Sequence, residues 1–204
     1  MKKGRVVRPV LQSELLRGNR LGDPSDRVTP VYLPPSYDES PNRRYPMILA
    51  IVGFTGTGRM LLNEDWFEPT LADRVDALID SGEMNEAIVV MPDGATRYGG
   101  SQYMDSAATG PYGRYTAVEV IAWADREFRT IPRREARGVF GKSSGGYGSF
   151  RMAVDYPEVF SAFACHSGDS AFEYCYMPEF PKALRYLWHK NTTPKRFLDA
   201  YRSI

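Results

Sequence analysis

The sequence predicts an α/β domain with a mostly parallel sheet, helices on both faces of the sheet and an antiparallel hairpin at the N-terminus. From residue 45 onward, continuous apolar runs of strand length alternate with amphipathic helical segments. This alternation is typical of parallel strands joined by right-handed crossovers. Before residue 45 the chain has two β-rich segments separated by a turn-forming stretch. A length of 204 residues fits one domain, so we expect residues 1–204 to fold together.

The N-terminal hairpin is expected over residues 5–16 and 27–35, joined by the turn sequence GNRLGDPSD. Pro30, Pro34 and Pro35 flank or interrupt the second segment. Proline has no N–H to donate to a neighbouring strand, so we expect this segment at an edge of the sheet.

The remaining strands and helices alternate along the chain. Apolar runs predict strands at 45–54, 86–94, 136–141 and 161–168, and helices are expected at 68–82, 115–128 and 147–157. The longest runs are apolar without alternation, which indicates strands covered on both faces. Cys165 lies in the last of these runs and is expected to be a buried structural thiol. The apolar positions of the second helix are expected to include Val118, Ile121, Trp123 and Phe128.

Composition excludes several classes of function. The 26 Lys and Arg residues nearly balance the 25 Asp and Glu residues, which argues against nucleic acid as a partner. Two cysteines without CxxC spacing predict neither a disulfide framework nor a metal site, and we expect no cofactor. Arg8 and Pro9 interrupt the first apolar stretch, and the run at 47–54 is too short to span a membrane. A cytoplasmic protein without a membrane partner is therefore expected.

In a parallel sheet the ligand site lies at the carboxyl ends of the strands. That rule selects the loops at 53–58, 92–113, 141–146 and 166–176. The loop at 92–113 is too long for a plain connection between a strand and a helix, which points to function or mobility.

Gly141, Ser143 and Gly145 form a GxSxG pattern between a predicted strand and a predicted helix. This is the context of a nucleophile elbow, where a strained turn exposes the serine hydroxyl. A Cβ atom at 141 or 145 would collide with the neighbouring strand and helix. The helix that follows presents its positive end to the site, so the Ser144 N–H can donate to a developing oxyanion. The alternatives are a glycine-rich turn that only packs the helix, and a phosphate-binding loop, for which the GxxxxGK[ST] spacing is missing.

An oxyanion hole needs a second donor, which the loop after the first buried parallel strand normally supplies. Phe54 N–H is the better candidate in this loop, and Thr55 N–H is the alternative. An ordinary glycine-rich turn is the remaining interpretation of the loop.

Four stretches, at 18–37, 53–58, 91–106 and 141–169, together resemble the esterase D-like esterases of the α/β-hydrolase fold. This group includes S-formylglutathione hydrolase, feruloyl and enterochelin esterases and the mycolyltransferases. The resemblance covers about residues 5–180, and its most specific part is the block around Ser143. It implies carboxylic ester hydrolysis with Ser143 as nucleophile and with Phe54 and Ser144 as oxyanion donors.

A serine nucleophile in this fold is followed along the chain by an acid and then by a histidine. The sequence contains only His166 and His189. His166, at the end of a predicted strand, is a candidate base but also fits pocket lining; His189 lies in an amphipathic helix and fits a surface role. Asp169 is three residues from His166, which suits a loop contact better than a triad.

The family places its acid and histidine beyond residue 204, so we expect a truncated or cleaved domain whose last strands are missing. A second polypeptide carrying the missing segment is then a partner, and a homo-oligomer stays open. The other explanation is a shortened homologue that has lost triad catalysis.

The leading functional hypothesis is a serine carboxylesterase that hydrolyses small or aryl esters through an acyl-enzyme. Tyr103, Thr55 and Gln102 are expected to contact the substrate, and Asp93 and Asp105 are expected to stabilise their loops. Two other hypotheses are an acyltransferase of the same fold and a non-catalytic binding homologue that lacks the triad histidine.

Overall fold

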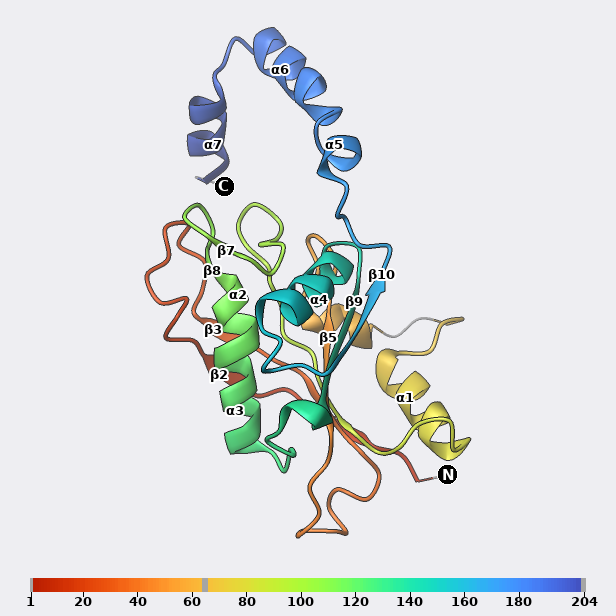
Figure 1. The fold of residues 1–204 in the computed structure, drawn as a ribbon. Helices are drawn as coiled ribbons and strands as arrows, with labels where there is room; N and C mark the ends of the chain where they lie inside the picture. The colour runs from red at the N-terminus through yellow and green to blue at the C-terminus, as the bar shows by residue number, and fades with distance from the viewer. Residues whose placement is uncertain (1, 64–65, 203–204) are drawn as a thin grey trace. The chain divides into compact units, whose positions relative to one another are not determined.

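The protein is described by a computed structural model that covers residues 2–63 and 66–202. The contacts divide the chain into two compact units, Met1–Gly168 and Asp169–Ile204. The first unit contains the β-sheet with its covering helices, and the second contains α5, α6 and α7 (Figure 1).

The main sheet of the first unit has six strands in the order β1-β4-β6-β5-β9-β10. The pairs β6–β5, β5–β9 and β9–β10 are parallel, whereas β4 is antiparallel to both β1 and β6. The prediction of a mostly parallel sheet is therefore confirmed. The strands are β1 (Arg5–Val7), β4 (Val31–Leu33), β6 (Ile88–Val90), β5 (Met47–Ile51), β9 (Arg137–Lys142) and β10 (Ala162–His166).

The predicted N-terminal hairpin is present but is divided between two sheets. β1 pairs with β4 in the main sheet, and β2 (Val10–Gln12) pairs with β3 (Asp26–Val28) in a separate two-stranded sheet. The predicted edge position of the second segment is wrong, because β4 lies between β1 and β6. Pro30 and Pro34 fall just outside the three residues of β4 and therefore remove none of its N–H groups.

Helices cover both faces of the sheet, as predicted. Along β5, Leu49 and Ile51 join the core that contains Val120 of α3 and Met152 of α4, while Ala50 joins the core beneath α1. This alternation follows from the two-residue period of a strand. The remaining helices and short strands of this unit are η1 (Gly58–Leu62), α1 (Leu71–Asp80), β7 (Asp105–Ser106), β8 (Gly110–Pro111), α2 (Tyr112–Arg114), η2 (Tyr115–Glu119), α3 (Val120–Glu127), η3 (Arg134–Ala136) and α4 (Ser144–Asp155).

The helix predicted over 115–128 contains a π-helical turn, η2. A π turn holds more residues than an α turn and changes which side chains face the core. Val118 is 51% exposed, so the expectation is wrong for this residue. Ile121 and Trp123 are buried and Phe128 packs against the core, as expected. The neighbouring Glu119 carboxylate accepts hydrogen bonds from the Ser13 hydroxyl and from the Glu14 N–H, which ties the turn to the N-terminal segment.

The prediction of a buried Cys165 is also wrong. β10 is the last strand in the order of the sheet, and all five of its residues are exposed. Cys165 is consequently an exposed free thiol. Its apolar neighbours in sequence indicated a strand correctly, but the strand order decides how much of it is covered.

The second unit consists of α5 (Phe172–Cys175), α6 (Glu179–His189) and α7 (Pro194–Arg202). On α6, Phe180, Leu184 and Trp188 recur every four residues and are all exposed. Tyr186 of α6 meets Phe197 of α7 edge to face, with ring centroids 6.1 Å apart. α6 is therefore amphipathic, as the sequence around His189 predicted.

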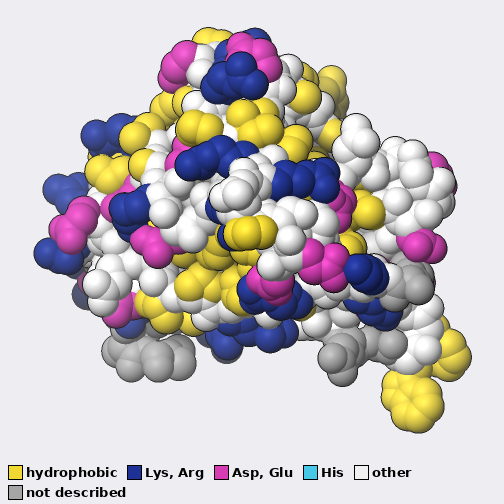
Figure 2. Space-filling view, turned by 90° about the horizontal axis from the view of Figure 1, so that it is seen from below, with side chains coloured by type: hydrophobic (Ala, Val, Ile, Leu, Met, Phe, Trp, Pro, Cys, Tyr) yellow, Lys and Arg dark blue, Asp and Glu magenta, His cyan; other side chains and the backbone are white. Residues whose placement is uncertain are grey.

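Basic and acidic side chains are interspersed on the face shown in Figure 2, in keeping with the nearly balanced composition. In the part of the chain that the structure describes, every helix is too short or too polar to cross a lipid bilayer.

Candidate active site

Three loops emerge from the same edge of the sheet, because β6, β5 and β9 are adjacent and parallel. One loop follows β5 and begins at Val52, the second follows β6 and contains Asp93, and the third is the turn from β9 into α4 at Ser143. The expected site residues of the sequence analysis other than His166 come from these loops. The carboxyl edge of the sheet is where an open α/β sheet binds its ligand.

Ser143 has a left-handed backbone conformation, with φ 57° and ψ −124°. A side chain other than glycine in such a region costs on the order of 1–3 kcal/mol, and the surrounding structure must hold it there. The Ser143 N–H donates to the His166 carbonyl at 2.9 Å, and the Ser143 carbonyl accepts from the Tyr147 N–H at 2.9 Å. The strained turn that the GxSxG pattern predicted is therefore present, fixed from both sides.

Gly141 and Gly145 allow this turn to approach the end of β5. An ideal Cβ on Gly141 would lie 2.6 Å from the Ile51 carbonyl oxygen, and one on Gly145 would lie 2.7 Å from the Val52 carbonyl oxygen. Both distances are shorter than carbon and oxygen atoms tolerate. The steric requirement for glycine at these two positions is confirmed.

The loop after β5 passes directly beside Ser143. An ideal Cβ on Gly53 would be 3.3 Å from the Ser143 Cβ, so the backbone at residues 53 and 54 borders the serine. The Thr55 N–H is already engaged, since it donates to the Gly99 carbonyl at 3.2 Å. No hydrogen bond within the described chain uses the Phe54 N–H. Of the two candidate donors in this loop, Phe54 is therefore the one that can serve a ligand.

The loop at 92–113 holds the loop after β5 in place. The Phe54 ring is 55% exposed and rests on the backbone of Gly99, where a Cβ would approach ring atom Cε2 to 2.7 Å. Tyr103 makes a second connection: its hydroxyl donates to the Val52 carbonyl at 2.9 Å and accepts from the Val52 N–H at 3.0 Å.

The three residues expected to contact the substrate have different environments. Tyr103 is only 3% exposed, and its burial raises the pKa of its hydroxyl well above the ordinary value. Its place is beneath the loops, where it positions Val52. Thr55 is exposed on the loop after β5, and Gln102 is half-buried; both have positive φ, at 64° and 56°.

His166 ends β10 opposite Lys142 and is exposed. Its carbonyl holds the Ser143 N–H, whereas its ring makes no hydrogen bond to any residue that the structure describes. His189 lies at the end of α6 in the second unit. In that unit Asp169 accepts a hydrogen bond from the Tyr176 hydroxyl at 3.3 Å. Within residues 2–63 and 66–168, no carboxylate is hydrogen-bonded to the His166 ring.

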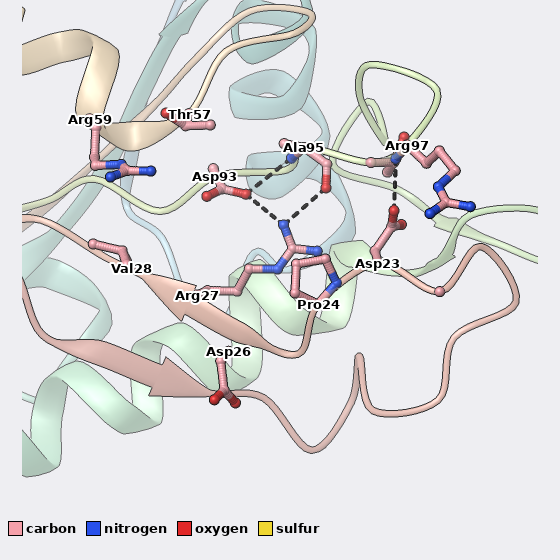
Figure 3. Close-up of a pocket in the computed structure, with 12 residues that line it drawn as sticks. Asp23, Pro24, Asp26, Arg27, Val28, Thr57, Arg59, Asp93, Ala95 and Arg97 are labelled. Carbon is pink, nitrogen blue, oxygen red and sulfur yellow. Dashed lines mark hydrogen bonds and ion pairs between the residues drawn. The ribbon is translucent and has the colours of Figure 1, made fainter. Parts of the chain in front are cut away.

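The sequence analysis missed Arg27, the buried centre of a polar network (Figure 3). Arg27 donates to the Asp93 carboxylate at 2.8 Å, to the Ala95 carbonyl at 3.0 Å and to the Tyr112 hydroxyl at 2.7 Å. The Tyr112 hydroxyl in turn donates to Asp23 at 3.1 Å. Asp93 therefore stabilises its loop, as expected.

Asp105 also stabilises its loop, by accepting from the backbone and guanidinium N–H groups of Arg114 at 3.0 and 2.7 Å.

Burial lowers the pKa of the Arg27 guanidinium, but Tyr112 and Asp93 raise it above the ordinary value, so Arg27 stays charged. Nothing in the local sequence around Arg27 could have signalled its role, because Asp93 is 66 residues away.

Replacing Gly141 with alanine tests the close approach of the turn to β5. We expect Gly141→Ala to reduce the free energy of unfolding by about 3 kcal/mol, because backbone atoms on both sides would have to move. Gly138→Ala is the matched control on the same strand, where an ideal Cβ meets only the Ala162 carbonyl oxygen at 3.7 Å. Urea unfolding followed by circular dichroism measures both. Equal losses in the two variants would contradict the steric account.

Replacing Tyr103 with phenylalanine tests the connection between the loops. Tyr103→Phe leaves the N–H and carbonyl of Val52 without their partner, and we expect a loss of about 1–3 kcal/mol in the free energy of unfolding. Tyr174→Phe, at a side chain that is 84% exposed, is expected to change stability by less than about 0.5 kcal/mol. Indistinguishable unfolding curves for the two variants would show that the hydroxyl of Tyr103 does not hold Val52.

Comparison with known proteins agrees with this architecture. Two esterases of Mycobacterium tuberculosis, Esterase MT1326 and Esterase Rv1288, are each 31% identical to the chain over 86 residues, which is 41% of the chain and 19% of the relative. The chain thus spans about a fifth of the length of these curated relatives.

Solved structures with a similar fold are also esterases and hydrolases. A ferulic acid esterase has a TM-score of 0.69 at 24% identity, covering 82% of this chain and 59% of its own. A mutant feruloyl esterase module from Clostridium thermocellum has a TM-score of 0.67 at 20% identity, and the match covers 83% of this chain and 56% of the module. An S-formylglutathione hydrolase from Agrobacterium tumefaciens has a TM-score of 0.60 at 20% identity, and the match covers 80% of this chain and 57% of the hydrolase.

These likenesses identify the α/β-hydrolase fold that the sequence predicted. The family model described as "Putative esterase" matches residues 24–198, which is most of the chain. This protein belongs to that esterase family.

Proposed function

We propose that the protein hydrolyses carboxylic esters with Ser143 as the nucleophile. The observation that carries the proposal is the backbone of Ser143, held at φ 57° between β9 and α4 at the carboxyl edge of the sheet. A strained serine at such a turn is the arrangement of a nucleophile elbow. Membership of the esterase family supports the same assignment.

The reaction has two steps that pass through an acyl-enzyme. The Ser143 oxygen bonds to the carbonyl carbon of the ester while its proton passes to a general base. The bond to the alcohol oxygen then breaks as that oxygen takes up a proton, which leaves the acyl group on Ser143. Water attacks the acyl group in the second step, releasing the carboxylic acid and restoring the serine.

A negative charge develops on the carbonyl oxygen of the ester during the attack. We assign its stabilisation to hydrogen bonds from two backbone donors, the Ser144 N–H and the Phe54 N–H. Ser144 is the first residue of α4, at the positive end of the helix dipole. Phe54 follows Gly53, whose Cβ position lies 3.3 Å from the Ser143 Cβ. Each such donor is worth roughly 10²–10³ in kcat in serine hydrolases.

The acyl group of the substrate is proposed to be small or aromatic. Among the similar structures, the ferulic acid esterase is named for an aromatic acyl group and the S-formylglutathione hydrolase for the small formyl group of a thioester. The exposed Thr55 and the half-buried Gln102 are the residues that we assign to substrate contact.

We assign the general base to a residue other than His166. A catalytic imidazole works in the tautomer and orientation that a partner acid imposes. Within residues 2–63 and 66–168 the His166 ring has no such partner, although its backbone holds the Ser143 N–H.

Covalent labelling tests the nucleophile. A fluorophosphonate is expected to label the protein at one residue, Ser143, and the Ser143→Ala variant is expected to lose both the label and ester hydrolysis. Ser161→Ala, at an exposed serine beside β10, serves as the matched control and should label as the unaltered protein does. Mass spectrometry of the labelled peptide identifies the site. Labelling at another serine, or none at all, would overturn the proposal.

A second variant tests the role of His166. We expect His166→Gln to change the rate constant of fluorophosphonate labelling by less than about threefold, because the ring lacks an orienting acid. A general base contributes roughly 10²–10⁴ to the rate. A fall of a hundredfold or more, with the fold unchanged by circular dichroism, would instead identify His166 as the base.

A further inference from the structure

A pocket of about 430 Å³ with several charged side chains in its lining lies at the same edge of the sheet as Ser143, and the mechanism above does not use it. Its walls come from the segment before β3, β3 itself, the start of η1 and the segment after β6 (Figure 3). The lining residues that bear on its chemistry are Asp23, Arg27, Thr57, Arg59, Asp93 and Arg97.

Arg27 gives this pocket a buried cation whose terminal nitrogens are engaged. The Arg27 side chain is only 5% exposed, and its terminal nitrogens donate to Asp93, Ala95 and Tyr112. Its Nε–H has no hydrogen-bond partner among the described residues. That nitrogen is shielded from solvent, so Arg27 contributes a buried positive charge to the wall of the pocket.

Arg59 adds a second cation on the opposite wall. It is exposed and forms no ion pair with any residue in 2–63 or 66–202. In Figure 3 its guanidinium group extends into the pocket from η1, toward Asp93. Thr57, two residues before it, also lines the pocket and carries a hydroxyl group that can donate.

The carboxylates of the pocket are already engaged. Asp93 accepts from Arg27 at 2.8 Å and from the Ala95 N–H at 3.2 Å. Asp23 accepts from the Arg97 N–H at 2.7 Å and from the Tyr112 hydroxyl at 3.1 Å. The carboxylate of Asp26 points away from the other labelled side chains in Figure 3. Among the described residues, Arg59 is therefore the side chain of this pocket that carries a positive charge and forms no ion pair.

We propose that this pocket binds a carboxylate group carried by the ester substrate. A carboxylate supplies two acceptor oxygens for the guanidinium fork of Arg59, and charge-assisted hydrogen bonds of this kind are stronger than neutral ones. The volume is within the range of sites for small molecules. This inference rests on the proposed ester hydrolysis, whose substrate class it narrows.

The pocket is within reach of Ser143 through the loop after β5. Gly53 borders Ser143, and Thr57 at the rim of the pocket is four residues farther along the chain. Four residues span at most about 14 Å even when fully extended. One small molecule can therefore place a carbonyl group near Ser143 and a carboxylate in the pocket.

Binding of amide analogues tests the pocket independently of hydrolysis. The probes are the monoanilides of succinic, adipic and suberic acid, each paired with the anilide of a straight-chain monocarboxylic acid of equal length. Isothermal titration calorimetry with the Ser143→Ala protein is expected to show at least one carboxylate binding at least about tenfold more tightly than its neutral pair. Arg59→Gln should reduce that preference to less than about threefold. Arg133→Gln, at an exposed arginine just before η3, should retain it.

The outcomes separate the two proposals. Equal binding within all three pairs, no measurable binding of any carboxylate, or an equal effect of Arg59→Gln and Arg133→Gln would overturn the pocket assignment. Fluorophosphonate labelling of Ser143 together with any of these results leaves the proposed hydrolysis intact. The opposite outcome is a carboxylate preference that depends on Arg59 without labelling of Ser143. It would overturn the proposed ester hydrolysis and support the pocket assignment.

Discussion

The close contact between the β9–α4 turn and the end of β5 is the constraint on which the site depends. The carbonyl groups of Ile51 and Val52 lie where side chains at residues 141 and 145 would otherwise be. Because those two positions are glycine, the helix begins directly against the neighbouring strand, and Ser143 between them is kept in a left-handed conformation. The same contact brings Gly53 beside the serine, so a single packing requirement positions both the proposed nucleophile and the proposed oxyanion loop.

The loop after β6 completes this arrangement with long-range hydrogen bonds. Tyr103 uses its hydroxyl as donor and acceptor to satisfy both backbone groups of Val52, and Gly99 accepts from Thr55. The loop is itself anchored at its start by the ion pair of Arg27 and Asp93, whose side chains are 5% and 10% exposed. Removing one partner of a buried pair leaves the other charge uncompensated, which costs about 3–5 kcal/mol. The pair therefore holds the loop and, through Tyr103, the end of β5.

The proposed carboxylate pocket follows from the same network. Arg27 uses its terminal nitrogens to organise the protein and pairs with Asp93, and Arg59 borders the same pocket. The residue that anchors the loop thus also keeps a carboxylate of the pocket paired. Structural support and substrate selection would then meet at the edge of the sheet where open α/β folds bind ligands.

The sequence by itself determined the features that depend on local chemistry. Apolar runs gave the parallel strands, helical spacing gave the covering helices, and the pattern of Gly141, Ser143 and Gly145 predicted the strained turn. Each of these rests on steric or hydrophobic preferences of residues that are close in the chain. The antiparallel hairpin was predictable for the same reason, although its division between two sheets was not.

Only the tertiary structure decided which residues are covered and which distant groups meet. The strand order placed β4 inside the sheet and left Cys165 exposed. The hydrogen bond to Gly99 engages the Thr55 N–H, whereas no described residue accepts from the Phe54 N–H. The partnership of Arg27 with Asp93 joins residues that are 66 positions apart. Burial and hydrogen bonding of this kind depend on how the strands are ordered and stacked, and no spacing within the sequence encodes that order.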